Sequence, residues 1–167
     1  SDGYTKFNEA QKTAARQALT EIGKSIGITF VENTISDAGN TISFANNNQA
    51  NSAGYAFYPA YSSTSRDVFM NQKSSGMLTM LDGTYSVYAL IHEIGHALGL
   101  KHPFEGTPQL SVAEDMTLYT MMSYTSDPAQ YALAYGELDL AALHYLYGPS
   151  SNTRAVNDVY VYSETEA

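Results

Sequence analysis

Three histidines and a glutamate lie close together in the chain, where residues 92–102 read HEIGHALGLKH. His92 and His96 are four positions apart, so on a helix their imidazoles share one face and can bind the same zinc ion. Glu93 follows the first of them and can reach a water at that ion. The pattern predicts a zinc site with His92 and His96 as metal ligands and Glu93 as the catalytic base.

A third ligand, His102, can reach this zinc only if the helix ends before it. Gly99 allows that turn, because glycine has no Cβ to clash when φ is positive. Three protein ligands leave one position open for water, which is typical of a catalytic rather than a structural zinc site. A lone histidine is more often a core residue, but this combination would arise by chance with a probability of roughly 10⁻⁵.

Two other features of the sequence bear on this site. The fourth histidine, His144, has no spacing that relates it to the others, and we expect it to have a packing or surface role. Residues 120–124 read TMMSY. A zinc site needs an apolar floor that fixes its ligands, and a flexible methionine suits that position. Two adjacent methionines are more often simply core, so this interpretation depends on the upstream motif.

Composition limits the class of protein. The 167 residues, of which 44% are apolar, are enough for one globular domain with a hydrophobic core. The net charge of −9 argues against non-specific nucleic-acid binding, and we attribute it to solubility. No stretch approaches the roughly 20 apolar residues of a membrane span. Without cysteine there are no disulfides or thiolate ligands, and we expect any export signal to lie outside this chain.

The elements that must position the motif are partly visible in the sequence. A first helix is predicted over residues 8–25, where Asn8 and Gln11 form a capping box. The helix that carries the motif is predicted over residues 85–98, and a third over residues 136–147. Alternating or β-branched stretches predict strands at the following positions. They are residues 28–32, 41–45, 53–58, 66–71 and, in the tail, 159–162.

With these motifs the chain resembles the serralysin-type metzincins. The zinc string matches the metzincin signature, and Pro103 after the third histidine is typical of the serralysin branch. Residues 122–124, which read MSY, resemble the Met-turn of that family. Weaker likenesses lie at residues 53–59, 113–115 and 136–148, so the resemblance covers about residues 8–155.

The resemblance implies a mixed α+β fold, the zincin-like fold of metzincins. That fold has a twisted, mostly parallel sheet of four to five strands with an antiparallel edge strand, two long helices, and a C-terminal subdomain with a third helix. One catalytic domain then fills residues 1–167. Its upper part covers about residues 1–99, its lower subdomain about residues 100–150, and its tail residues 151–167.

The resemblance also implies roles and an activity. Met122 would be the Met-turn residue, and Tyr124 would approach the zinc as a fifth ligand and swing away to bind the developing oxyanion. The activity implied is a zinc-dependent endopeptidase that hydrolyses internal bonds of extended polypeptides, with Glu93 as general base of a metal-activated water. The substrate would pair with an edge strand formed by Gly54, Tyr55, Ala56, Phe57 and Tyr58. The resemblance implies a secreted, extracellular bacterial protein that is a monomer. It would bind one Zn²⁺ and could bind a proteinaceous inhibitor.

The chain departs from the family in three ways. Few residues precede the first helix. Either residues 4–7 are the remnant of a family strand, or that strand is missing. No G-G-x-G-x-D repeat occurs, and Ca²⁺ is therefore not predicted, although family members bind it near this junction. The segment between Pro103 and the Met-turn is short, which leaves the specificity open.

Other functions stay open at this point. A non-catalytic domain could keep the zinc site as a scaffold, but such relatives normally lose the glutamate or a ligand, and here all four residues are present. A metalloprotease could act mainly by docking on an inhibitor or a host surface. The chain could also belong to the matrixin-like or astacin-like branches, but Pro103 argues against both.

Overall fold

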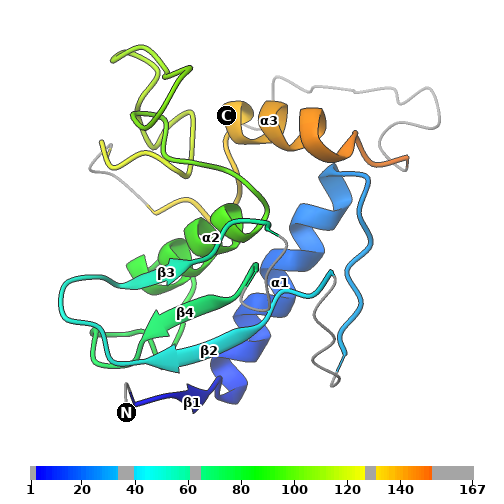
Figure 1. The fold of residues 1–167 in the computed structure, drawn as a ribbon. Helices are drawn as coiled ribbons and strands as arrows, with labels where there is room; N and C mark the ends of the chain where they lie inside the picture. Colours follow the sequence, from blue (N-terminus) through cyan, green and yellow to red (C-terminus); the bar gives the residue numbers. More distant parts are fainter. Residues whose placement is uncertain (1–2, 34–39, 61–64, 127–130, 152–167) are drawn as a thin grey trace, which may run out of the picture.

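The computed structural model describes residues 3–33, 40–60, 65–126 and 131–151. Their elements follow in the order β1 (Thr5–Lys6), α1 (Glu9–Ser25), β2 (Phe44–Asn47), β3 (Gly54–Ala56), β4 (Val68–Asn71), α2 (Tyr85–Ala97) and α3 (Glu137–Tyr147). Figure 1 shows α1 and α2 on one face of the sheet, with α3 beyond the end of that layer. The protein therefore has a mixed α+β fold.

The four strands form one sheet in the order β1-β2-β4-β3. Strands β2 and β4 run parallel, whereas β1 and β3 are antiparallel to their neighbours. The predicted antiparallel edge strand is confirmed as β3. Of the two alternatives for residues 4–7, a short strand is present as β1. The expectation of a mostly parallel sheet is wrong, because only the β2–β4 pair is parallel.

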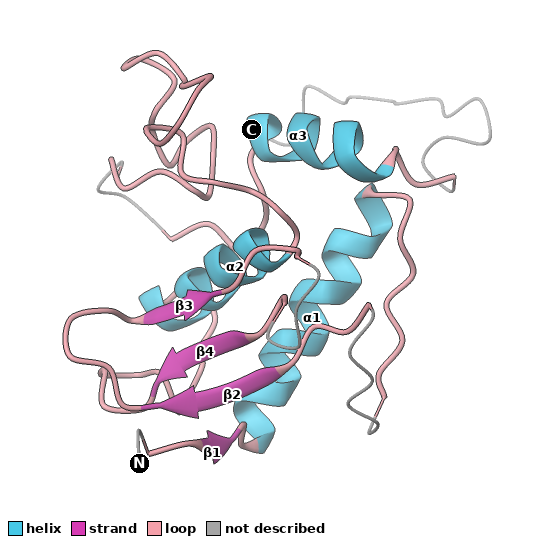
Figure 2. Cartoon of the chain, in the orientation of Figure 1, coloured by secondary structure: helices cyan, strands magenta, loops and turns pink. Residues whose placement is uncertain are grey.

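Residues 28–32 do not form the strand that their alternation predicts. Ile28 and Phe30 are partly buried against the core, whereas Val31 is 81% exposed. In the described part of the chain no strand pairs with this segment, which Figure 2 draws as a loop. The alternation thus reflects packing on one side of an extended chain, and the sheet has one strand fewer than its sequence pattern indicates.

Strand β2 covers Phe44–Asn47 instead of the predicted residues 41–45, so Asn46 and Asn47 lie in a strand although the predicted strand ended before them. Both amides are buried and satisfied. Asn46 exchanges hydrogen bonds of 2.6 and 3.0 Å with Gln11, and Asn47 Nδ2 donates to the Tyr55 hydroxyl at 2.9 Å. Because these partners offset the cost of burying the amides, polarity alone was a poor guide here.

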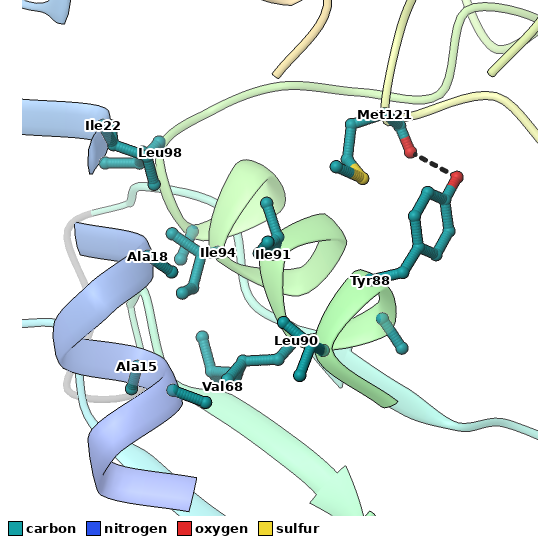
Figure 3. Packing of buried hydrophobic residues seen from close by; sticks show 14 of the residues in the cluster. Ala15, Ala18, Ile22, Val68, Tyr88, Leu90, Ile91, Ile94, Leu98 and Met121 are labelled. Carbon is teal, nitrogen blue, oxygen red and sulfur yellow. Dashed lines mark hydrogen bonds between the residues drawn. The ribbon is translucent and has the colours of Figure 1, made fainter. Parts of the chain in front are cut away.

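The hydrophobic core lies between the two long helices and the sheet. Figure 3 shows Ala15, Ala18 and Ile22 of α1 facing Leu90, Ile91 and Ile94 of α2, with Val68 of β4 beside them. Helix α1 begins with the predicted capping box: Asn8 Oδ1 accepts from Gln11 N, and Gln11 Oε1 accepts from Asn8 N. This packing fixes α2, the helix that carries the motif.

Between α2 and α3 the described residues, 98–126 and 131–136, form turns and loops without helix or strand (Figure 2). This agrees with the lack of periodicity in residues 101–126. Helix α3 begins after Gly136 and ends at Gly148, close to its predicted bounds. The strand predicted at residues 159–162 lies outside the described residues. In the part of the chain that is described, no helix has the length and apolar character needed to cross a membrane.

Candidate metal centre

Helix α2 is enclosed along nearly its whole length, since every residue from Ser86 to Ala97 is buried. Leu90 and Ile94 face the core, while His92 and Glu93 line a cleft on another side of the helix. The rings of His92 and His96 lie 4.8 Å apart, as expected for residues separated by four positions. The helix therefore presents two imidazoles to one point in space.

The turn after α2 brings the chain back toward these two rings. Gly99 has φ +101°, and the amides of Gly99 and Leu100 donate to His96 O and Gly95 O, each at 2.9 Å. This double hydrogen bond is the Schellman motif that ends many helices at a glycine. The turn also aims Leu100 O at His96 Nδ1, 2.7 Å away. The predicted role of Gly99 in breaking the helix thus agrees with its geometry.

The third histidine completes a cluster of nitrogen atoms. His102 Nε2 lies 3.2 Å from His92 Nε2 and 3.1 Å from His96 Nε2. Nitrogens bound tetrahedrally to one zinc at about 2.0–2.1 Å lie about 3.3 Å apart, so these spacings fit a shared ion. Among the described residues this is the one group of three such side chains that could hold a metal.

Hydrogen bonds on the far side of the rings set the tautomers of the two helical histidines. His92 Nδ1 donates to Met121 O at 2.9 Å, and His96 Nδ1 donates to Leu100 O. A carbonyl can only accept, so the lone pair of each Nε2 faces inward. Burial lowers the pKa of His92 to about 4 and lowers the pKa of His96 as well, which keeps both rings neutral. Neutral imidazoles with converging lone pairs fit a zinc ion.

The third ring has a carboxylate behind it instead of a carbonyl. His102 Nδ1 lies 2.9 Å from Glu105 Oε1, at hydrogen-bond distance but without the direction of a full hydrogen bond. This contact with His102 lowers the pKa of Glu105, which is therefore ionised at neutral pH. A carboxylate in this position orients a metal-binding histidine and raises its basicity.

Glu93 is buried beside the cluster. Burial raises the pKa of its carboxyl group to about 8, and its Oε2 has no hydrogen-bond partner. A carboxyl group whose pKa lies near neutrality can both take up and release a proton. The structure thus brings Glu93 to the place where the sequence predicts a base.

Met122 packs against helix α2 at Gly95, the residue before His96. Only 1% of it is exposed, and a Cβ added to Gly95 would come within 2.7 Å of its Sδ. The absence of a side chain at Gly95 therefore lets the sulfur press against α2 next to His96. The position agrees with the predicted apolar floor.

The neighbouring Met121 contributes through its backbone. Its carbonyl accepts from His92 Nδ1 and from the Tyr88 hydroxyl, each at 2.9 Å. Figure 3 shows the hydrogen bond from Tyr88. Its amide donates to Asp139 Oδ2 at 2.6 Å, and Thr120 Oγ1 donates to Asp139 Oδ1 at 2.6 Å. Burial raises the pKa of Asp139, while these hydrogen bonds oppose the rise. The acceptor of His92 is thus anchored by the first turn of α3.

Aromatic rings surround the open side of the cluster. Tyr124 is 68% exposed, and its ring centroid lies 4.6 Å from that of His102. Phe104 stacks on His102 at 5.1 Å, and Tyr58 lies 5.3 Å from His96. The structure therefore brings Tyr124 to the site, while the role of its hydroxyl stays a prediction.

A cleft of about 1250 Å³ opens beside His92 and Glu93. It is lined by residues 51–54 next to β3, by the first half of α2, and by parts of the loops at 117–126 and 131–133. Of the predicted edge-strand residues, Gly54 lines this cleft. Tyr55 and Phe57 instead pack on Phe69, at ring distances of 5.0 and 6.3 Å. The strand ends at Ala56, so Phe57 and Tyr58 lie beyond it.

The sequence reasoning missed the partners behind the three rings. Two of these, Leu100 and Met121, act through carbonyl groups that no side-chain pattern reveals. The other two carry weak signals: Glu105 follows His102 by three positions, and Asp139 follows Gly136 by three, as in a helix cap. His144 lies apart from the site, with its Nε2 2.8 Å from Ser25 O, which agrees with its predicted surface role.

Comparisons with known proteins point the same way as this geometry. The family model described as metallo-peptidase family M12B, reprolysin-like, matches residues 12–151. The chain is 34% identical to a serralysin of Proteus mirabilis, over 93% of its own length and 38% of that protein. It is 32% identical to serralysin A of Dickeya chrysanthemi, over 95% and 37%. It is also 32% identical to metallopeptidase AprA of Pseudomonas marginalis, over 95% and 38%. The chain thus spans little more than a third of the length of these relatives.

Proposed function

The chain belongs to the reprolysin-like metallopeptidases of family M12B, and from this premise we propose that it is a zinc-dependent endopeptidase of the serralysin type, with a metzincin fold. Its reaction would be the hydrolysis of internal peptide bonds in extended polypeptides. The observation that carries this proposal is the convergence of three imidazole rings, with His102 Nε2 3.2 Å from His92 Nε2 and 3.1 Å from His96 Nε2. His92, His96 and His102 would hold the metal.

In the proposed mechanism, zinc supplies Lewis acidity, which makes water acidic near neutral pH and polarises the scissile carbonyl. Glu93 takes the proton of the attacking water on its carboxylate and passes it to the nitrogen of the leaving amine. Its burial beside His92 and the absence of a hydrogen-bond partner at Oε2 support this role. Met122 supports the ligands from beneath and takes no part in proton transfer.

Tyr124 is proposed to act on the oxygen of the scissile bond. Its ring lies beside His102 and Phe104 and is 68% exposed, so most of its surface faces solvent. In the resting enzyme its hydroxyl would approach the metal. During the reaction it would donate a hydrogen bond to the carbonyl oxygen as that oxygen gains negative charge.

The substrate is proposed to lie extended along β3. This strand is at the edge of the sheet and pairs on one side with β4, and Gly54 at its start lines the cleft with Glu93. An extended peptide can add to such an edge through backbone hydrogen bonds, which accept many sequences. We therefore expect broad specificity. Secretion from a bacterial cell remains part of this proposal.

Replacement of the base tests the mechanism. Glu93→Ala should keep the zinc and the fold and lower the rate of casein hydrolysis by at least about 100-fold, because the ligands remain while the proton acceptor is gone. Glu21→Ala, which removes a carboxylate of an exposed ion pair on α1, is the matched control and should hydrolyse casein normally. Near-normal hydrolysis by Glu93→Ala would refute the assigned role.

A zinc-binding domain without activity is the alternative from another class. A chromogenic peptide assay with and without chelator separates the two functions. Hydrolysis that stops on chelation and returns with zinc supports the enzyme. A protein that binds one zinc ion per chain and cleaves no peptide would be a scaffold instead.

A further inference from the structure

The ammonium group of Lys101 lies among backbone carbonyl oxygens of the loop that follows α2. Its Nζ is 2.8 Å from Pro108 O and 3.4 Å from His102 O, and it also donates to Glu105 O. An ammonium group has three N–H donors and no acceptor, so three carbonyls satisfy it. Several carbonyl oxygens around one positive charge form the kind of environment that proteins otherwise build around a bound Ca²⁺.

Carbonyls, and not a carboxylate, are the partners of this lysine. Within the described ranges no acidic side chain lies at ion-pair distance from Lys101. Other hydrogen bonds close the same loop: Glu105 N donates to His102 O at 3.2 Å, and Leu110 N donates to Pro103 O at 3.0 Å. The loop is therefore compact although it contains no helix or strand.

Of the three proposed metal-binding histidines, only His102 lies on this loop and not in helix α2. His102 has Glu105 as the partner of its Nδ1, and the Glu105 side chain is 49% exposed. The place of this carboxylate depends on the backbone of residues 102–108, in which Pro103 is buried and residues 104–108 are exposed. Lys101 binds that backbone at three points along its length.

We propose that Lys101 is a positioning residue, whose ammonium group gathers the carbonyls of residues 102, 105 and 108 in the manner of a resident cation and thereby holds Glu105 against His102. The inference rests on the proposed function, because it treats His102 as a zinc ligand. In this proposal the Lys101 ammonium group takes the place that a bound cation would otherwise have in the loop.

The test measures zinc affinity of the full chain by competition with a chromophoric chelator. Lys101→Met keeps the length of the side chain and removes the charge and donors, and it should weaken zinc binding by about 10-fold, the lower end of the range for an outer partner of a ligand. Lys101→Arg keeps a positive charge with N–H donors and should bind zinc more tightly than Lys101→Met. Lys24→Met removes an equal charge from an exposed ion pair on α1 and should bind like the parent protein.

A double-mutant cycle shows whether Lys101 acts through Glu105. Glu105→Gln should weaken zinc binding by about 10- to 100-fold, and the double variant with Lys101→Met should bind no more weakly than Glu105→Gln alone. Independent losses that multiply would overturn the inference, as would parent-like affinity in Lys101→Met or equal affinities of the Met and Arg variants. A parent protein that binds no zinc would instead refute the proposed function. Far-ultraviolet circular dichroism should show the same fold in every variant.

Discussion

His92 and His96 lie buried in helix α2, whereas His102 lies half-buried on the loop behind Gly99. The two helical rings donate to carbonyls that the fold itself places, Met121 O and Leu100 O. The loop ring faces a side chain, Glu105, on a segment that must be held by its own contacts. The helix side of the site, with His92 and His96, is therefore held in place by the core. The loop side, with His102, is held by contacts within the loop.

This difference separates two kinds of consequence. A change on the helix side disturbs buried hydrogen bonds and should alter the stability of the metal-free protein as well as zinc binding. A change on the loop side should alter zinc binding or catalysis and leave the metal-free fold as it is. Each prediction below places a residue on one side or the other.

The largest effect is expected from loss of a ligand. His96→Ala and His102→Ala should each lower zinc content from one ion per chain to near zero, since two protein ligands remain. Only His96→Ala should also lower the free energy of unfolding of the metal-free protein, by about 1–3 kcal/mol, because it leaves Leu100 O without its buried donor. Metal analysis and urea unfolding check both parts. Equal stability of the two variants would contradict the division into sides.

The next effect depends on pH and concerns Glu93. Its pKa is raised by burial from 4.5 to about 8, so between these values the metal-free native state holds a proton that the unfolded chain has released. The free energy of unfolding therefore falls as the pH rises through this window. Glu93→Gln lacks this dependence and should be more stable than the parent at about pH 9, by a few kcal/mol in order of magnitude, and similar at about pH 4.

Glu105 provides the contrast for that measurement. The contact with His102 lowers its pKa, and the side chain is half exposed. Its charge therefore favours the native state above its ordinary pKa, the opposite sign to Glu93. Glu105→Gln should show no gain in stability at high pH. A gain similar to that of Glu93→Gln would mean that both carboxylates are held in the same way.

A smaller effect is expected at Tyr124 on the loop side. Tyr124→Phe removes one hydroxyl and should lower kcat by about 100-fold, the usual effect of losing a hydrogen-bond donor to the developing negative charge. Zinc content and metal-free stability should not change, because the side chain is largely exposed. Steady-state kinetics on a peptide substrate measure the effect. An unchanged kcat would remove Tyr124 from the mechanism.

The smallest effect is expected at Asp139, which anchors the helix side from a distance. The Asp139 carboxylate accepts from Thr120 Oγ1, Met121 N and Gly136 N. Asp139→Asn replaces one of its two oxygens with an NH₂ group and should lower the free energy of unfolding by about 2 kcal/mol. Urea unfolding measures this loss. Asp67→Asn, on the segment before β4, is a control for the change of charge and should unfold like the parent. Full stability of Asp139→Asn would show that the Met-turn does not depend on α3.

The sequence was most informative where chemistry and local geometry coincide. The spacing of His92, Glu93 and His96 can be interpreted without any tertiary knowledge, because one helical turn brings the side chains together. Gly99 and the capping box of Asn8 are likewise local signals. These features predicted α1 and α2 correctly, and the structure brings His102 to the other two rings.

Where tertiary packing decides, the sequence pattern misled. Residues 28–32 alternate as a strand does, yet pairing requires a neighbour, and no local pattern supplies one. Asn46 and Asn47 fall outside the strand predicted at residues 41–45, because their buried partners, Gln11 and Tyr55, are not adjacent to them in sequence. The acceptors behind His92 and His96 are backbone atoms, which every residue possesses, so their identity follows only from the fold.

The hydrogen bond from His92 to Met121 gives the site an order of assembly. A nascent chain that has just emerged past His102 contains all three imidazoles, but the acceptor of His92 is still to come, and Asp139, which holds that acceptor, comes later again. Ligands that are adjacent early in synthesis thus become a rigid centre only after the distant helix has docked. If the chain is the proposed endopeptidase, its activity would therefore begin only once the domain is complete.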